Sequence, residues 1–79
     1  MALKIFLSAN LRRHVPDYDP HTGFALEIPS GTTVGQVLST LNIPATEVAL
    51  LMVNGINQGL EFALQGQERL GFFPPIGGG

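Results

Sequence analysis

Hydrophobic residues alternate with other residues in two short segments near the start of the chain. Within residues 2–8 every second side chain is aliphatic, and these share one face: Leu3, Ile5 and Leu7. The opposite face is more polar but includes an aromatic residue: Lys4, Phe6 and Ser8. A period of two predicts a half-buried strand, which residues 9–15 either prolong or leave in a short turn. Residues 24–28 repeat the alternation and predict a second strand, antiparallel to the first because a turn-rich loop at 16–23 joins them.

A helical repeat follows the second strand. Thr33 and Gln36 have the spacing of a capping box, in which each side chain bonds a backbone N–H of the other residue. Apolar residues then recur at the spacing of one helical face: Val34, Val37, Leu38 and Leu41. Asn42 and Pro44 end this repeat. We therefore expect one amphipathic helix that packs its apolar face on the strands.

The second half of the chain contains two further strand patterns. Residues 48–53 are continuously apolar, which predicts a strand covered on both faces, and Asn54-Gly55 predicts a tight hairpin after it. Residues 60–64 are less regular and fit either a short helical turn or an edge strand. After a turn at 65–67, residues 68–73 predict the last strand, with Leu70 and Phe72 facing inward.

The order of these elements predicts an α+β fold, in which a mixed sheet of four to five strands packs on one main helix. If the first and last strands are neighbours, Phe6 and Phe73 share the outer face of the sheet. The two rings would then form an aromatic docking patch for a partner. The alternative is that loops cover both rings.

The last residues have an unusual composition. Pro74 and Pro75 stop the last strand and favour an extended exit from the fold, and after Ile76 the sequence is Gly77-Gly78-Gly79. Residues 1–75 are therefore predicted as the folded domain and residues 76–79 as a flexible tail. The extended tail reaches about 13 Å, enough to thread a narrow channel in a partner. A disordered terminus or a leftover linker is the alternative explanation.

Composition restricts the function further. The 79 residues are 44% hydrophobic and only 13% charged, which fits one small packed domain. The net charge is −2 with no basic stripe, so nucleic-acid binding is not expected. The absence of cysteine excludes disulfides, thiolate metal sites and cysteine nucleophiles, and it favours a cytoplasmic location. No apolar run has the length of a membrane span.

Titratable side chains give no convincing catalytic or metal site. Asp17, Asp19 and His21 alternate, but an oxygen-ligand site usually needs more ligands, so these residues are interpreted as a solvated loop. Ser8, His14 and Asp17 have no spacing that would orient a catalytic triad. We therefore expect no metal and no catalytic side chain.

The element order and the tail together resemble the MoaD/ThiS family of ubiquitin-like β-grasp sulfur carriers, over essentially the whole chain. The most specific motifs are Val53-Asn54-Gly55 and the ending Phe72-Phe73-Pro74-Pro75-Ile76-Gly77-Gly78-Gly79, which is more similar to the molybdopterin branch than to the thiazole branch. One departure is Gln65-Gly66-Gln67, where the family commonly has Asp-Gly-Asp.

The resemblance implies a mechanism that takes place at the C-terminus. An E1-like enzyme would use ATP to adenylate the carboxylate of Gly79, and a sulfur donor would then displace AMP to leave a thiocarboxylate. The acceptor would be a pterin precursor bound to the large subunit of molybdopterin synthase, and the sulfur would form the dithiolene of molybdopterin. The protein would be a co-substrate and not an enzyme, with no bound cofactor. The partner-binding residues would be those of the patch and the tail: Phe6, Phe73, Pro74, Pro75, Ile76, Gly77 and Gly78.

Three other functions remain open at this point. The activated Gly79 would form an isopeptide bond with target lysines if the protein is a ubiquitin-like modifier. A carrier for thiazole or cysteine synthesis would differ only in the sulfur acceptor. A plain interaction module would bind through its sheet and would not need the tail.

Overall fold

The computed structural model describes residues 2–75, so the predictions for Ile76–Gly79 lie outside the described residues. The elements in chain order are β1 (Leu3–Leu7), the 3₁₀ helix η1 (Ala9–His14), β2 (Phe24–Leu26), α1 (Val34–Thr40), the 3₁₀ helix η2 (Ala45–Glu47), β3 (Leu50–Val53), β4 (Ile56–Asn57) and β5 (Arg69–Phe73). The strands form one sheet in the order β2-β1-β5-β3-β4. The predicted α+β arrangement of a mixed sheet on one main helix is confirmed.

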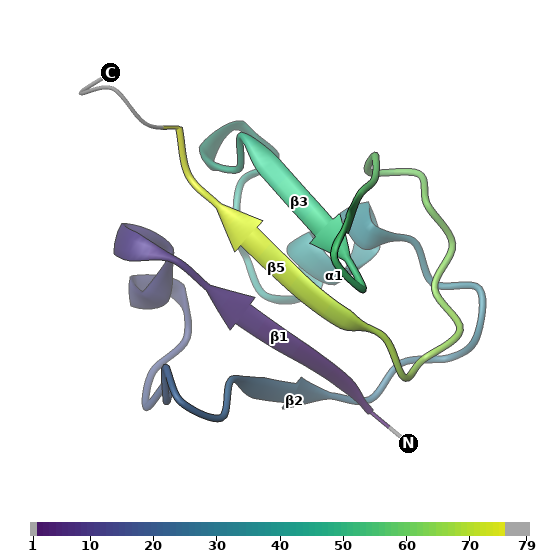
Figure 1. Ribbon diagram of the computed structural model, residues 1–79, viewed down its shortest axis with the longest axis horizontal. Helices are drawn as coiled ribbons and strands as arrows, with labels where there is room; N and C mark the ends of the chain where they lie inside the picture. Colours follow the sequence, from purple (N-terminus) through teal and green to yellow (C-terminus); the bar gives the residue numbers. More distant parts are fainter. Residues whose placement is uncertain (1, 76–79) are drawn as a thin grey trace.

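The first and last strands lie side by side at the centre of the sheet. They are parallel, with Phe6 opposite Gly71 and Leu7 opposite Phe72, while every other strand pair is antiparallel. In Figure 1 the sheet lies in front of α1, and β5 leads out of the sheet toward the C-terminal end. No helix within residues 2–75 has the length and apolar character needed to cross a membrane.

The core lies between the sheet and α1. Its fully buried side chains come from alternate strand positions, from one face of α1, from η1 and from the segment before β5. The largest are Phe72, Leu3, Ile5, Leu7, Leu11, Leu38, Leu64, Leu70, Val34 and Val37. The inward direction predicted for Leu70 and Phe72 is therefore confirmed. Burial of each large apolar side chain contributes about 1.5–3 kcal/mol, which makes this layer the main source of stability.

The predicted capping box and hairpin are both present. The Gln36 backbone N–H donates to Thr33 Oγ1 at 3.2 Å, and the Thr33 backbone N–H donates to Gln36 Oε1 at 2.8 Å. Asn54 and Gly55 have φ of 52° and 82°, and Val53 pairs with Ile56 across them. Two successive positive φ values are those of the type I′ turn, which matches the twist of the strands it joins.

Of the two alternatives for residues 9–15, the chain turns and does not prolong β1, because Ala9 turns the backbone to φ 52° and η1 begins there. Three sequence-based predictions need correction. The second strand ends at Leu26 and not at Ile28. Residues 48–53 are not covered on both faces: β3 begins at Leu50, which is 37% exposed, and Met52 is only half-buried. The reason is that α1 covers only one face of this sheet. Residues 60–64 form neither a helical turn nor a strand, apart from one bridge between Thr33 and Ala63.

The turn before β5 is held by a carboxylate that the sequence reading missed. The Glu68 side chain is 9% exposed, and it accepts hydrogen bonds from the backbone N–H groups of Gln65 at 2.7 Å, Gly66 at 2.9 Å and Gln67 at 3.2 Å. Desolvation by burial raises the pKa of the Glu68 carboxyl, but these backbone hydrogen bonds lower the pKa more, so it lies below its ordinary value.

Replacing Glu68 with Gln is expected to lower the free energy of unfolding by about 1–3 kcal/mol at pH 7, because an amide has one acceptor oxygen for three N–H donors. A lowered folded-state pKa gives stability that is present above the unfolded-state pKa and is lost as the pH falls through the folded-state pKa. Urea unfolding of the two proteins should therefore give curves that approach each other below about pH 4. A difference that is constant from pH 7 to pH 3 would contradict this role of Glu68.

Candidate functional site

The outer face of the sheet carries an apolar groove. Alternate residues of β1, β5 and β3 point away from α1, and those that form the groove include Phe6, Gly71, Phe73 and Met52. Gly71 lies opposite Phe6 on one side and Met52 on the other. A Cβ on Gly71 would lie 3.2 Å from Cε1 of Phe73, so that ring leans over the glycine. Because Gly71 has no side chain, its backbone forms the floor of the groove.

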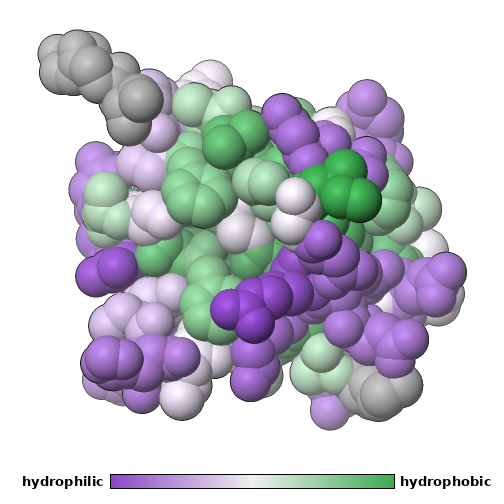
Figure 2. All heavy atoms as spheres, in the orientation of Figure 1, coloured by the Kyte–Doolittle hydropathy of each residue, from purple (hydrophilic) through white to green (hydrophobic). Residues whose placement is uncertain are grey.

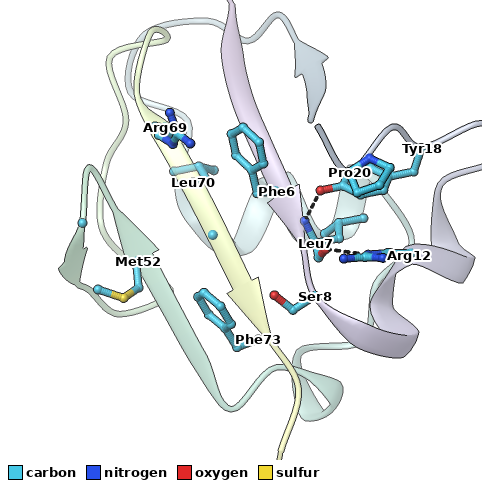
Figure 3. A pocket seen from close by; sticks show the side chains of 12 residues that line it. Phe6, Leu7, Ser8, Arg12, Tyr18, Pro20, Met52, Arg69, Leu70 and Phe73 are labelled. Carbon is cyan, nitrogen blue, oxygen red and sulfur yellow. Dashed lines mark hydrogen bonds between the residues drawn. The ribbon is translucent and has the colours of Figure 1, made fainter. Parts of the chain in front are cut away.

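The groove is open to solvent although much of its surface is apolar. Its volume is about 420 Å³, and the Phe73 side chain is 38% exposed. Figure 2 shows hydrophobic side chains gathered over the middle of this face next to strongly hydrophilic ones. Figure 3 shows Phe6 and Phe73 on the same side of the sheet, with Arg69 beside Phe6. The structure therefore places the two predicted aromatic residues on one face and leaves Phe73 partly exposed.

Two arginines and a tyrosine frame this groove, and the sequence analysis assigned none of them to a site. The Arg69 guanidinium lies 4.4 Å from the centre of the Phe6 ring, and that of Arg12 lies 5.9 Å from the centre of the Tyr18 ring. The Tyr18 hydroxyl accepts the Leu7 backbone N–H at 2.7 Å, and Arg12 Nε donates to the Leu7 backbone oxygen at 3.1 Å (Figure 3). Period-two alternation places Arg69 on the face of Phe73, so this one signal was present in the sequence.

The chain leaves the sheet at a well-defined point. Backbone hydrogen bonds hold the end of β5 from both sides: Ser8 N–H donates to the Phe72 oxygen at 3.2 Å, and Ala49 N–H donates to the Phe73 oxygen at 2.8 Å. Pro74 and Pro75 follow and border a hollow between η1 and η2. Since proline has no N–H, the strand pairing ends here.

An ionic cluster joins η1 to η2 beside the two prolines. Glu47 Oε1 lies 2.7 Å from Arg13 Nη2 and 2.8 Å from His14 Nε2. The hydrogen bond from His14 and the charge of Arg13 lower the pKa of the Glu47 carboxyl, although desolvation opposes them. The cluster therefore keeps its carboxylate charged at neutral pH and links the two 3₁₀ helices on either side of the exit.

The other candidate residues of the sequence reading are not brought into a site. The Asp19 carboxylate accepts the His21 backbone N–H at 2.8 Å, which is a local turn contact. Within residues 2–75 no group of three His, Asp or Glu side chains is arranged to hold a metal ion. Of the predicted partner-binding residues, Phe6, Phe73, Pro74 and Pro75 are described, and their binding role stays a prediction. Ile76, Gly77, Gly78 and Gly79 lie outside the described residues.

Comparison with solved structures identifies similar folds. Two crystal structures of small archaeal modifier protein 1 from Haloferax volcanii superpose with TM-scores of 0.72 and 0.71 at 21% and 22% identity, and they cover 95% and 100% of this chain and 98% and 100% of those chains. A putative molybdopterin converting factor, subunit 1, from Pyrococcus furiosus gives a TM-score of 0.70 at 18% identity and covers 96% of this chain and 99% of that chain. At such identities the likeness shows the fold, which confirms the ubiquitin-like β-grasp prediction.

Comparison of the sequence itself gives one clear match. No curated protein matches the chain. The family model described as Mut7-C ubiquitin matches residues 2–76, which is nearly the whole sequence. The resemblance to ubiquitin-like proteins predicted from the sequence is thereby confirmed, and the chain belongs to the Mut7-C ubiquitin family.

Proposed function

We propose that this protein carries sulfur at its C-terminus: the Gly79 carboxylate is adenylated by an E1-like enzyme and then converted to a thiocarboxylate. The observation that supports this most is the end of β5. The strand is held from both sides through Phe73, two prolines then end the pairing, and the sequence continues as Ile-Gly-Gly-Gly. A rigid strand followed by residues without bulk suits a terminus that must enter another protein's active site.

The chemistry requires little from the chain itself. A carboxylate is a poor acyl donor until one oxygen becomes a good leaving group, so ATP supplies AMP to that oxygen and pyrophosphate is released. A hydrosulfide equivalent from a sulfur donor then attacks the carbonyl carbon, and AMP leaves. Glycines 77–79 have no side chains to obstruct a narrow channel. The partners supply the acid, base and metal, so we propose a co-substrate and not a catalyst.

The groove on the outer face would receive the activating enzyme or the acceptor. It is apolar, partly exposed and lies along β5, the strand that leads to the tail. A partner bound there would therefore restrict where the C-terminal carboxylate can lie relative to the partner's active site. This restriction would lower the entropic cost of the reaction.

The final acceptor separates two versions of the proposal. A thiocarboxylate that donates sulfur to a pterin precursor, for molybdopterin synthesis, is the version we favour, supported by the ending Phe-Phe-Pro-Pro and by the similar fold of the Pyrococcus furiosus protein. Transfer of Gly79 to lysines is the second version, supported by the similar fold of the Haloferax volcanii modifier protein. Sulfur transfer toward thiazole or cysteine differs from the first version only in the acceptor.

Trapping with hydroxylamine tests the activation step that both versions share. The protein is incubated with ATP and an extract of its source cells, and hydroxylamine converts any acyl adenylate to a hydroxamate with loss of AMP. Fragment mass spectrometry should locate the hydroxamate on Gly79, only when ATP is present. An extract that activates a known carrier but leaves Gly79 unmodified would refute the proposal.

Replacing Gly71 with Val is expected to slow hydroxamate formation about tenfold at low protein concentration and much less at saturation, because the added side chain fills the floor of the groove and weakens docking. The matched control is Ala25→Val, which places the same valine side chain at an exposed position of β2 on the same face of the sheet. Initial rates measured over a range of protein concentrations decide the point. Equal rates for the two variants would exclude the groove as the docking site.

A further inference from the structure

The cations of this acidic protein are unevenly placed. The chain has four Lys and Arg residues and a net charge of −2. Within residues 2–75 only Arg13 has a carboxylate partner, Glu47. The other three lie on or beside the outer face: Arg12 and Arg69 line the groove, and Lys4 is the strand neighbour of Arg69. No acidic residue is among those that line the groove.

The neighbouring position of Lys4 and Arg69 is unfavourable for the isolated domain. The two residues lie opposite each other on adjacent strands, and like charges in that relation destabilise a sheet. No carboxylate within residues 2–75 lies within ion-pair distance of either side chain. A cost of this kind, which no carboxylate of the described residues offsets, is typical of a surface that meets opposite charge elsewhere.

The two arginines of the groove are also held in place before any partner binds. Arg69 stacks 4.4 Å above Phe6, and Arg12 is tethered by its Nε bond to the Leu7 oxygen. Each guanidinium has five N–H donors, so most donors of both groups remain available for a carboxylate. Less conformational entropy is lost when a pre-oriented guanidinium binds, which favours a specific ion pair over a diffuse attraction.

We propose that the groove binds a segment of the partner protein in which a hydrophobic side chain is flanked by carboxylates. The hydrophobic side chain lies over Gly71 between Phe6 and Phe73, and the carboxylates bind Arg69 and Arg12. This inference rests on the proposed function, because it gives the chemistry of the partner that the groove receives. The turn before β5 agrees with this inference. The MoaD/ThiS resemblance would lead one to expect acidic residues there, but Gln65 and Gln67 carry no charge, so the turn adds no negative charge that would repel a partner's carboxylates.

A selection of displayed peptides tests the inference without ATP or extract. Random twelve-residue peptides on phage are selected on the immobilised full-length protein, and the enriched sequences are synthesised with a fluorescent label. We expect enrichment of peptides with one or two large hydrophobic residues next to Asp or Glu. We also expect at least about tenfold weaker binding when the same Asp and Glu residues are changed to Asn and Gln, and weaker binding in high salt.

Variants of the protein locate the site. Arg69→Gln and Arg12→Gln should each weaken the acidic peptide about tenfold, whereas Arg13→Gln, which removes the cation already paired with Glu47, should change it less than about twofold. Circular dichroism checks that each variant is folded. Selection of neutral or basic peptides, no selection at all, or equal binding by the Arg69 and Arg13 variants would overturn the inference. Peptide binding with no hydroxamate at Gly79 would instead refute the proposed function. A hydroxamate at Gly79 with no binding of acidic peptides would refute this inference alone.

Discussion

Deleting Gly78 and Gly79 is expected to reduce modification of the C-terminus by at least about a hundredfold while the domain stays folded. The deletion withdraws the carboxylate by about 7 Å, and misplacement of a reacting group by about 1 Å already costs on the order of a hundredfold in rate. The free energy of unfolding should change by less than about 0.5 kcal/mol, because the buried core ends at Phe72. Hydroxamate formation and urea unfolding measure the two effects separately.

A second variant controls for length. Replacing Gly79 with Ala keeps the length of the tail but puts a side chain on the residue that carries the carboxylate. If the glycines serve to pass a narrow channel, this variant should also lose modification. If the protein is a plain interaction module, both variants should bind the partner as well as the wild-type protein does. That result, together with an unmodified Gly79 in the wild-type protein, would contradict the carrier hypothesis and favour the interaction module.

Replacing Phe72 with Ala is expected to lower the free energy of unfolding by about 3–5 kcal/mol, whereas Phe73→Ala should lower it by about 1 kcal/mol or less. The two residues are adjacent and identical in type, but Phe72 is fully buried and Phe73 is 38% exposed. Since small domains are stable by only about 5–15 kcal/mol, Phe72→Ala should be partly unfolded under mild denaturation. The chain has no Trp, so far-UV circular dichroism in urea is the suitable measurement.

The same pair separates folding from docking. Phe73→Ala should remain folded yet bind the selected peptides more weakly and form the hydroxamate more slowly at low concentration, because it removes one wall of the groove. Similar losses of stability in the two variants would mean that the assignment of Phe72 to the core and Phe73 to the outer face is wrong.

Local patterns predicted most of the fold because local interactions determine most of its elements. The Thr33–Gln36 box and the Asn54-Gly55 turn depend on contacts within four residues, and both form as expected. The alternation of residues 68–73 correctly assigned Leu70 and Phe72 to the core. The hypothesis of an aromatic patch required the first and last strands to be neighbours, and the pairing of β1 with β5 fulfils this requirement.

The features that were missed lack a hydrophobic repeat. The start of η1 at Ala9 and the contact of the Tyr18 hydroxyl with the Leu7 N–H have no periodic signature in the sequence. Glu68 resembles a surface residue in the sequence, yet its carboxylate organises the turn before β5. These features depend on backbone turns and polar side-chain contacts, which hydrophobic patterning does not encode.

The misjudged strand is informative about the site. A continuous apolar run is consistent with a strand covered on both faces, and β3 was predicted in that way. In the structure Leu50 and Met52 instead face the open side of the sheet, in the same region as Phe73. Met52 and Phe73, which the domain leaves partly uncovered on this face, are therefore among the residues that we assign to docking.

Thiol-specific labelling tests the central proposal most directly, because the chain contains no cysteine. The protein is incubated with ATP, a sulfur donor and an extract of its source cells, treated with a thiol-alkylating reagent and fragmented in the mass spectrometer. Fragment localisation is essential, since oxidation of Met1 or Met52 changes the total mass by nearly the same amount as one sulfur-for-oxygen exchange. A label on Gly79 that requires ATP is the predicted result and would identify a thiocarboxylate. An unlabelled Gly79, in an extract that labels a known sulfur carrier, would contradict the sulfur-carrier assignment, and Gly79–lysine adducts in the same sample would identify a modifier instead.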